Sequence, residues 1–194
     1  MTRDILFVQG GGEGAYAFDA QLAENLQSTL GPGYRVQYPH MPNEDSPNDQ
    51  AWKSKLAEEL AALGDGVIVV AHSVGATICL AGLSEDGDAA KISGLFLIAP
   101  PFIGEGGWSI PEFEPMAGVG AKLPKDLPIY LYHGRADDIV PFAHVELYAK
   151  ALPQAHVRLI DAADHQLSND LSDVAADIRR VGESAPRPLI RAST

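Results

Sequence analysis

The stretch Gly66-Val67-Ile68-Val69-Val70-Ala71-His72-Ser73-Val74-Gly75 decides the fold. Its first half is rich in Val and Ile, which predicts a buried β-strand, and a helix is predicted directly after it. Small residues stand two before and two after Ser73, as a strand and a helix that cross closely at a sharp turn require. A serine at the apex of such a turn has strained backbone angles, which cost roughly 1–3 kcal/mol. The stretch therefore predicts a strand, a tight turn that exposes Ser73, and a helix.

Short apolar runs alternate with longer amphipathic segments in the rest of the chain, which is typical of βα units around a parallel sheet. Most of the runs are continuously apolar, as strands covered on both faces should be. The predicted strands are Ile5–Gln9, Tyr34–Tyr38, Val67–Ala71, Gly94–Ala99, Ile129–His133 and His156–Ile160. The sequence thus predicts an α/β fold.

Predicted helices lie between these strands. The second one opens with Ser46 as its N-cap, has Pro47 in its first turn and carries Asp49 three residues after the cap. The last one closes at Gly182, because glycine is favoured just past a helix end. The predicted helices are Tyr16–Leu30, about Pro47–Leu63, a helix that starts right after Ser73, about Phe142–Ala151, and Asp170–Val181.

The reactivity of Ser73 depends on a base, because a serine hydroxyl is a weak nucleophile until a histidine takes its proton. The histidine needs a carboxylate to fix its tautomer. His165 follows the last predicted strand, so it lies at the same edge of the sheet as Ser73. Asp137 and Asp138 both follow the fifth predicted strand, and their position alone does not separate them. Among the other histidines, His72 is expected to point away from the turn and His133 to brace the acid loop.

A run of three glycines, Gly10-Gly11-Gly12, follows the first predicted strand. The dinucleotide-binding pattern G-x-G-x-x-G is matched only loosely, and the P-loop Gly-Lys-Ser/Thr is absent. Glycine lets a backbone N–H come within about 2.7–3.1 Å of a carbonyl oxygen without a side chain in the way. We therefore expect an oxyanion donor here, with Gly11 as the first choice and Gly12 as the second, and the Val74 N–H as the other donor.

These loops together resemble the α/β-hydrolase superfamily over about residues 4–182. The matching stretches are Gln9-Gly10-Gly11, where relatives often have His-Gly-X, then Ala71–Gly75, His133-Gly134-Arg135-Ala136-Asp137 through Val140-Pro141, and Asp164-His165. The chain is most similar to the short, nearly cap-less serine hydrolases and carboxylesterases, including the retinoblastoma-binding serine hydrolase group. Met41-Pro42 and the downstream Trp52 also resemble that group.

The resemblance implies a three-layer α/β/α fold with a reduced parallel sheet of about six strands in the order 2-1-3-4-5-6. It favours Asp137 over Asp138 as the acid. The chain departs from the usual pattern at Gln9, which replaces the common His, and at Ala71, which replaces the usual Gly. The implied site residues are the nucleophile Ser73, the acid Asp137, the base His165, and the oxyanion donors Gly11 and Val74.

One long connection, Ile103–Lys125, breaks the βα rhythm. It is rich in Gly and Pro, and long loops in compact domains are usually functional or disordered. Being too short for a large cap domain, it is expected to form a small flap beside the active site. Candidate residues of a substrate pocket are Gly12, Phe102, Trp108 and Met116, although the apolar ones fit a plain core equally well. A single α/β-hydrolase domain is expected over residues 1–182, with a loose C-terminal tail over residues 183–194.

The composition argues against several classes of protein. A net charge of −12, from 14 basic and 26 acidic residues, repels phosphate, so neither nucleic acid nor an anionic membrane is expected as a partner. The only cysteine, Cys79, excludes an intrachain disulfide and a Cys/His metal cluster, and it is expected in the core. The sequence has no run of about 18 apolar residues, so no transmembrane helix is predicted. The amino terminus lacks a signal peptide's layout. A cytoplasmic location is expected.

The predicted reaction is hydrolysis of a small soluble carboxylic ester through an acyl-enzyme on Ser73, with no metal or organic cofactor. A thioesterase or an amidase would use the same triad. A binding module that keeps the fold without turnover is the alternative from another class, and the complete set of Ser, Asp and His argues against it. The oligomeric state is not predicted by the sequence.

Overall fold

The computed structural model describes residues 2–85 and 87–184 of the chain. A six-stranded sheet forms its centre, in the order β2-β1-β3-β4-β5-β6, and every neighbouring pair of strands is parallel. The strands are β1 Arg3–Val8, β2 Tyr34–Gln37, β3 Val67–His72, β4 Ile92–Ile98, β5 Ile129–Gly134 and β6 His156–Ile160. The predicted strands, their order and the α/β class are confirmed, with strand ends that differ by one or two residues.

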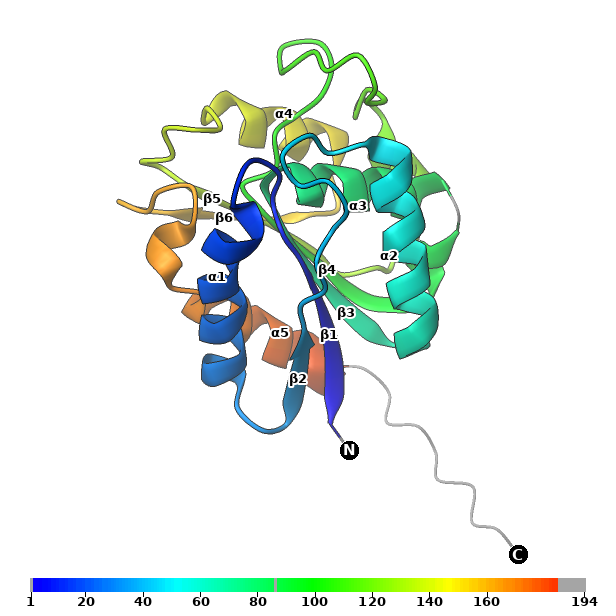
Figure 1. Cartoon of the computed structure of the whole chain (residues 1–194), viewed down its shortest axis with the longest axis vertical. Coiled ribbons are helices and arrows are strands. Elements are labelled where there is room, and N and C mark those ends of the chain that lie inside the picture. The colour runs from blue at the N-terminus through cyan, green and yellow to red at the C-terminus, as the bar shows by residue number, and fades with distance from the viewer. Residues whose placement is uncertain (1, 86, 185–194) are drawn as a thin grey trace, which may run out of the picture.

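In the part of the chain that the structure describes, five α-helices cover the two faces of this sheet (Figure 1). The buried residues of α1 and α5 belong to one apolar cluster, and those of α2, α3 and α4 belong to the other. The helices are α1 Ala15–Leu30, α2 Asp49–Leu63, α3 Ser73–Glu85, α4 Ala143–Ala151 and α5 Ser172–Ser184. The chain therefore has three layers, α/β/α, as predicted.

Strand β1 shows why its sequence is continuously apolar. Ile5 and Phe7 pack into the cluster with α1 and α5, whereas Leu6 and Val8 pack into the cluster with α2 and α3. Successive side chains of a strand point to opposite faces, so a strand that is covered on both faces needs apolar residues at every position. Because all six strands run the same way, the loops that follow their carboxyl ends meet at one edge of the sheet.

The start of α2 differs from the prediction. Asn48, not Ser46, is the N-cap: its backbone is extended, with φ −98° and ψ 122°, and its side-chain Oδ1 accepts the Ala51 N–H at 2.9 Å. Ser46 is exposed, and its N–H donates to the Asn43 carbonyl in a preceding turn. The sequence offered two capping residues two positions apart, and the turn before the helix selects the second.

The end of α5 is a second correction, because Gly182 lies inside the helix. A Cβ at Gly182 would lie 2.6 Å from Arg3 Nη1 and 3.0 Å from Tyr34 Oη, so the missing side chain makes room for these two residues. Asp170 lies before the helix, and its carboxylate accepts the Ser172 N–H at 2.9 Å. Glu183 and Ser184, expected in a loose tail, belong to α5, and residues 185–194 of that predicted tail lie outside the described residues.

The segment 103–125 lies at the end of the sheet where the strands have their carboxyl ends, and it forms the loop at the top of Figure 1. Two hydrogen bonds fold it back on its start: Trp108 N–H to the Phe102 carbonyl and Met116 N–H to the Ile103 carbonyl, both 2.8 Å. Ile103 and Met116 are buried in the core. The segment is thus anchored at two points, and its role as a flap stays a prediction.

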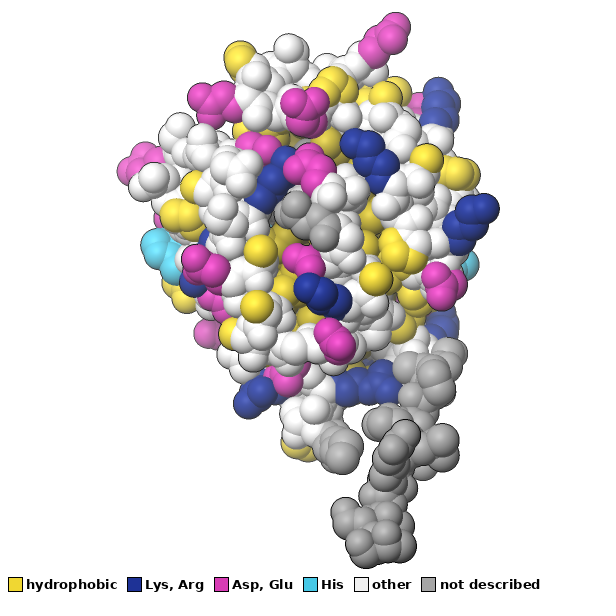
Figure 2. Space-filling view, turned by 90° about the vertical axis from the view of Figure 1, so that its right-hand side faces the viewer, with side chains coloured by type: hydrophobic (Ala, Val, Ile, Leu, Met, Phe, Trp, Pro, Cys, Tyr) yellow, Lys and Arg dark blue, Asp and Glu magenta, His cyan; other side chains and the backbone are white. Residues whose placement is uncertain are grey.

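Charged side chains of both signs are interspersed on the face that includes α2 (Figure 2). Within the described residues, no helix is long and apolar enough to cross a membrane.

The capping of α2 gives a stability prediction. Asn48→Ala leaves the Ala51 N–H without its acceptor, so the free energy of unfolding should fall by about 1 kcal/mol. Ser46→Ala should change it by less than about 0.5 kcal/mol, because Ser46 is exposed and does not cap the helix. Urea denaturation of both variants measures the difference. Equal losses, or a larger loss for Ser46→Ala, would contradict this assignment of the cap.

Candidate active site

The turn between β3 and α3 has the geometry that the sequence predicts. Ser73 has φ +53°, a left-handed conformation that non-glycine residues rarely adopt. A Cβ at Gly75 would lie 1.9 Å from the Gln9 carbonyl oxygen, so no larger residue fits there without moving the backbone. Ala71 is the fully buried, next-to-last residue of β3. The structure thus holds Ala71 in the buried strand before the serine, whereas Gly75 has no room for a side chain.

The structure brings Ser73, His165 and Asp137 into one chain of hydrogen bonds. His165 Nε2 lies 2.9 Å from Ser73 Oγ, and His165 Nδ1 lies 2.9 Å from Asp137 Oδ2. A carboxylate accepts only, so Nδ1 carries the proton, and in a neutral ring Nε2 is then free to accept from the serine hydroxyl. These three residues follow β3, β6 and β5 respectively, at the carboxyl edge of the sheet.

The environment of Asp137 keeps it ionised. Burial alone would favour the neutral acid, but hydrogen bonds from His165 and from the N–H groups of Val140 and Ile139 hold the pKa of Asp137 below its ordinary value. The neighbouring Asp138 is exposed and is not the carboxylate on His165. The structure thus identifies Asp137 as the carboxylate on His165, a choice that position along the chain did not decide.

Three other histidines, His72, His133 and His144, are bonded to partners other than Ser73. His133 Nε2 donates to the Val140 carbonyl at 3.0 Å, which braces the loop that carries Asp137, as expected, and burial lowers the pKa of His133. His72 points away from the turn toward Asp19 on α1. His144 lies on α4, where its Nδ1 accepts the Phe102 N–H at 2.7 Å. His165 is therefore the histidine next to the serine.

Among the three consecutive glycines, two N–H groups have partners. The Gly10 N–H donates to Asp19 Oδ2 at 2.7 Å, and the Gly12 N–H donates to the Glu44 carbonyl at 2.6 Å. At Gly11, a Cβ would lie 2.3 Å from Pro47 Cγ and 2.7 Å from Val74 Cγ1, so this backbone lies against the start of α3. The Val74 N–H is in the first turn of α3, where helix N–H groups have no intrahelical acceptor.

Gln9 explains how the chain manages without the common histidine. Its side chain is fully buried, its Nε2 donates to Glu44 Oε2 at 2.6 Å, and its Oε1 accepts the Met41 N–H at 3.1 Å. Glu44 Oε2 also accepts the Tyr16 N–H at 2.7 Å. Gln9 and Glu44 therefore join the glycine loop, the start of α1 and the β2–α2 loop. Sequence reasoning missed Glu44, because an acidic residue in a polar loop gives no signal.

Met41-Pro42 and Trp52 are connected in the same region. Trp52 Nε1–H donates to the Pro42 carbonyl at 2.6 Å, and the side chains of Met41 and Trp52 are buried in the core. The loop between β2 and α2 is thus bonded to α2 at Pro42 and packed into the core at Met41.

The candidate pocket residues have different environments. Phe102 and Met116 are 4% and 2% exposed and belong to the apolar core. Trp108 is 36% exposed and packs edge-on against His144. Gly12 has φ +123°, and a Cβ at this position would meet no atom within 4 Å, so Gly12 borders open space. Their contact with a substrate stays a prediction.

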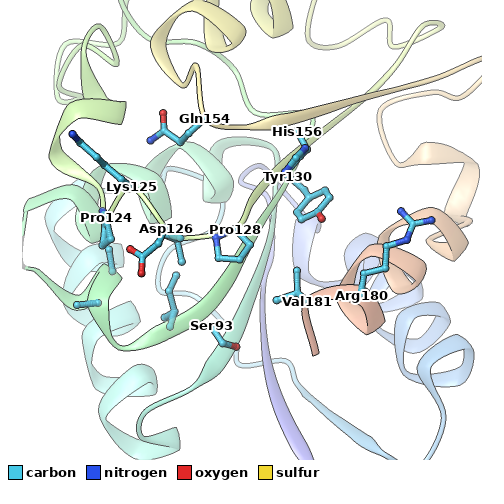
Figure 3. Close-up of a pocket in the computed structure, with 14 residues that line it drawn as sticks. Ser93, Pro124, Lys125, Asp126, Pro128, Tyr130, Gln154, His156, Arg180 and Val181 are labelled. Atoms are coloured by element: carbon cyan, nitrogen blue, oxygen red, sulfur yellow. The ribbon is translucent and has the colours of Figure 1, made fainter. Parts of the chain in front are cut away.

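A cavity of about 750 Å³ lies at the end of the sheet where the strands begin, opposite the end that carries Ser73 (Figure 3). Ser93 near the start of β4, Pro128 just before β5 and His156 at the start of β6 line it. Tyr130 and Arg180 lie on the side of α5 in this view. Because these positions are at the amino ends of the strands, the cavity is separate from Ser73.

The buried thiol and the possible metal ligands were the remaining candidates for reactive groups. Cys79 is buried in α3, and its burial raises the pKa of its thiol. Within residues 2–85 and 87–184, no group of three or more His, Cys, Asp or Glu side chains could hold a metal ion.

Comparison with solved structures supports the fold. The ydeN gene product from B. subtilis superposes with a TM-score of 0.72 at 18% identity, covering 94% of this chain and 100% of that one. SOBER1 from Arabidopsis thaliana gives 0.67 at 16% identity, covering 93% and 99%. The esterase RhEst1 from a Rhodococcus species gives 0.68 at 14% identity, covering 95% and 92%. At these identities the likeness shows a shared fold.

Sequence comparison supplies the family. The family model described as serine hydrolase matches residues 21–171, a range that contains Ser73, Asp137 and His165. A search of curated proteins gave no match. The finer resemblance to the retinoblastoma-binding group is not shown by these comparisons. Since the family model matches well over half of the chain, this protein belongs to the serine hydrolase family and is a hydrolase with the α/β-hydrolase fold.

Proposed function

We propose that the protein is a carboxylesterase that cleaves small soluble carboxylic esters with Ser73, His165 and Asp137 as its catalytic triad. The observation that carries the proposal is the continuous path from Ser73 Oγ through both ring nitrogens of His165 to Asp137 Oδ2, with both hydrogen bonds at 2.9 Å. A strained serine at a strand–helix turn, held beside a correctly oriented imidazole, is suited to acyl transfer.

In the first half of the reaction, His165 Nε2 takes the proton of Ser73 as Oγ attacks the ester carbonyl carbon. The positive charge that develops on the imidazole is stabilised by the ionised Asp137 on Nδ1. The tetrahedral intermediate collapses when His165 gives the proton to the leaving alcohol oxygen. The ester C–O bond breaks, and an acyl ester of Ser73 remains.

We assign to the Gly11 and Val74 N–H groups the role of stabilising the negative charge on the carbonyl oxygen by donating hydrogen bonds to it. The N–H groups of Gly10 and Gly12 are already donated to Asp19 and Glu44, which favours Gly11 within the glycine loop. A Cβ at Gly11 would lie 2.7 Å from Val74 Cγ1, so Gly11 is packed against the residue that carries the other proposed donor. Losing one such donor typically costs roughly 100- to 1000-fold in rate.

In the second half, His165 takes a proton from water, whose oxygen attacks the acyl carbon. Collapse of the second intermediate returns the proton to Ser73 Oγ and releases the carboxylic acid. None of these steps needs a cofactor, so we propose none.

The choice of a small soluble ester rests on the entrance to the site. Segment 103–125 is too short to form a large cap domain, and it is tied to the core, which favours a small substrate. The net charge of −12 disfavours phosphate-rich surfaces, and we propose that neither nucleic acid nor a membrane is a partner. With its single buried cysteine, the chain suits the cytoplasm, which we propose as its location.

The nucleophile can be tested with p-nitrophenyl acetate and butyrate. Ser73→Ala should lower kcat by more than about 1000-fold, because the acyl-enzyme can no longer form. Ser93→Ala is a matched control, since Ser93 lies near the amino end of β4, and it should retain activity within about twofold. Circular dichroism of each variant checks folding. Full activity of Ser73→Ala, or a folded wild type that cleaves neither ester, would contradict the proposal.

The acid can be tested by comparing two adjacent residues. Asp137→Asn should lower kcat by about 10⁴-fold, because an amide favours the wrong tautomer of His165. Asp138→Asn removes an exposed carboxylate of the same loop and should change kcat by less than about threefold. Steady-state kinetics at pH 7.5 measures both. Equal effects of the two substitutions would remove Asp137 from the triad.

A further inference from the structure

Asp19 and His72 form a buried ion pair that the reaction described above does not use. His72 Nδ1 lies 2.8 Å from Asp19 Oδ2, and their side chains are 3% and 2% exposed. Asp19 is on α1, and His72 is the last residue of β3, directly before Ser73. Taking two such charges out of water is costly, and their mutual attraction compensates for it only where further hydrogen bonds satisfy both groups. The further hydrogen bonds of Asp19 and His72 therefore show which segments the pair holds in place.

Those partners are the two loops beside Ser73. Asp19 Oδ2 also accepts the Gly10 N–H at 2.7 Å, which fixes the residue before Gly11. On the other side, His72 Nε2 lies 3.0 Å from the His165 carbonyl oxygen, and the two imidazole rings are 4.7 Å apart between centroids. The pair thus connects the glycine loop, the serine turn and the backbone of the base.

The hydrogen-bond partners of His72 favour its charged form. Both of its ring nitrogens face atoms that can only accept, a carboxylate and a carbonyl, so both nitrogens must donate. Only the imidazolium form has two N–H groups. Burial opposes that charge, but Asp19 and the hydrogen bond to the His165 carbonyl outweigh it and raise the pKa of His72 above its ordinary value.

The packing around the pair leaves little room for adjustment. A Cβ at Gly10 would lie 3.1 Å from Ser73 Cβ, 3.3 Å from His72 Nδ1 and 3.4 Å from Asp19 Oδ2. Any movement of the pair is therefore passed to Gly10 and Ser73. A misplacement of about 1 Å near reacting groups can cost roughly 100-fold in rate.

We propose that Asp19 and His72 are positioning residues for ester hydrolysis: as a charged pair, they align the glycine loop and the backbone of His165 with Ser73. The proposal rests on the function proposed above. Asp19 orients the glycine loop through Gly10, and His72 holds the loop of the base through its Nε2–H. Neither side chain touches the substrate.

The charged form of His72 gives the proposal a pH dependence. The groups that face His72 are Asp19 from α1, His165 from the β6–α5 loop and Asp137 from the β5–α4 loop, and both carboxylates favour the cation. A group with a raised pKa keeps its proton until the pH exceeds that raised value. The cation therefore persists to a higher pH than that of an ordinary histidine, and kcat should fall on the alkaline side when His72 loses its proton.

Two substitutions at the pair and one matched control test this inference. Asp19→Asn and His72→Asn should each lower kcat by about 10- to 100-fold with KM changed less than about threefold, because alignment is lost while the substrate surface remains. In Asp19→Asn the alkaline limb of kcat should move to lower pH. Asp177→Asn is the control: it removes an equally buried carboxylate, bonded to Tyr132 and Arg158, and should lower the Tm but leave kcat within about twofold.

A measurement on the wild type keeps the test independent of how the variants fold. Long-range ¹H–¹⁵N spectra should show both ring nitrogens of His72 protonated at neutral pH, with deprotonation following the alkaline loss of kcat. A neutral His72 ring, or variants that lose stability but keep kcat and the pH profile, would overturn the inference. A wild type that cleaves no ester would instead overturn the proposed function, so the two failures are distinct.

Discussion

The crossing of β1, β3 and α3 at one point is the constraint on which the rest of the site depends. Gly75 approaches the Gln9 carbonyl so closely that a Cβ would lie 1.9 Å from the oxygen, and Ser73 must adopt φ +53° for the chain to turn there. Strain of this kind, roughly 1–3 kcal/mol, persists only where the surroundings hold it. Here the buried strand β3, paired with β1 on one side and β4 on the other, provides that support.

The loops around the turn are held by polar side chains from other elements. Gln9 and Glu44 tie the glycine loop to the β2–α2 loop, and Asp19 and His72 tie it to α1 and to the backbone of His165. These groups are buried or partly buried, and each has at least two hydrogen-bond partners. A polar network of this kind stabilises one arrangement of the loops, because a half-satisfied network would leave costly unpaired groups. The positions of the serine and the imidazole are thus set from several sides.

Local patterns made most of the fold predictable from the sequence. Continuous apolar runs such as Val67–Ala71 identify buried strands, and parallel strands place their following loops at one edge, so Ser73, Asp137 and His165 could be expected to meet. The choice of Asp137 over Asp138 needed either a family resemblance or the structure. Adjacent residues in one loop have the same position on the sheet and differ only in which way they point.

Long-range contacts explain what the sequence did not predict. Gly182 reads as a helix end, yet its missing side chain accommodates Arg3, a residue from the other end of the chain. Similarly, Asn48 rather than Ser46 caps α2 because a turn through Asn43 ends just before it. Asp19 carries no local sign of its role, since an acidic residue on an amphipathic helix ordinarily faces solvent. Each of these positions is decided by a partner that sequence periodicity does not identify.

The most direct test of the central claim is to locate the covalent adduct that a p-nitrophenyl phosphonate forms with the folded protein. If Ser73 is the nucleophile and His165 its base, peptide mass spectrometry should find one phosphonyl group per chain, on Ser73. His165→Gln should react far more slowly under the same conditions. A label on another residue, or no label on a folded wild type, would contradict the account of the site.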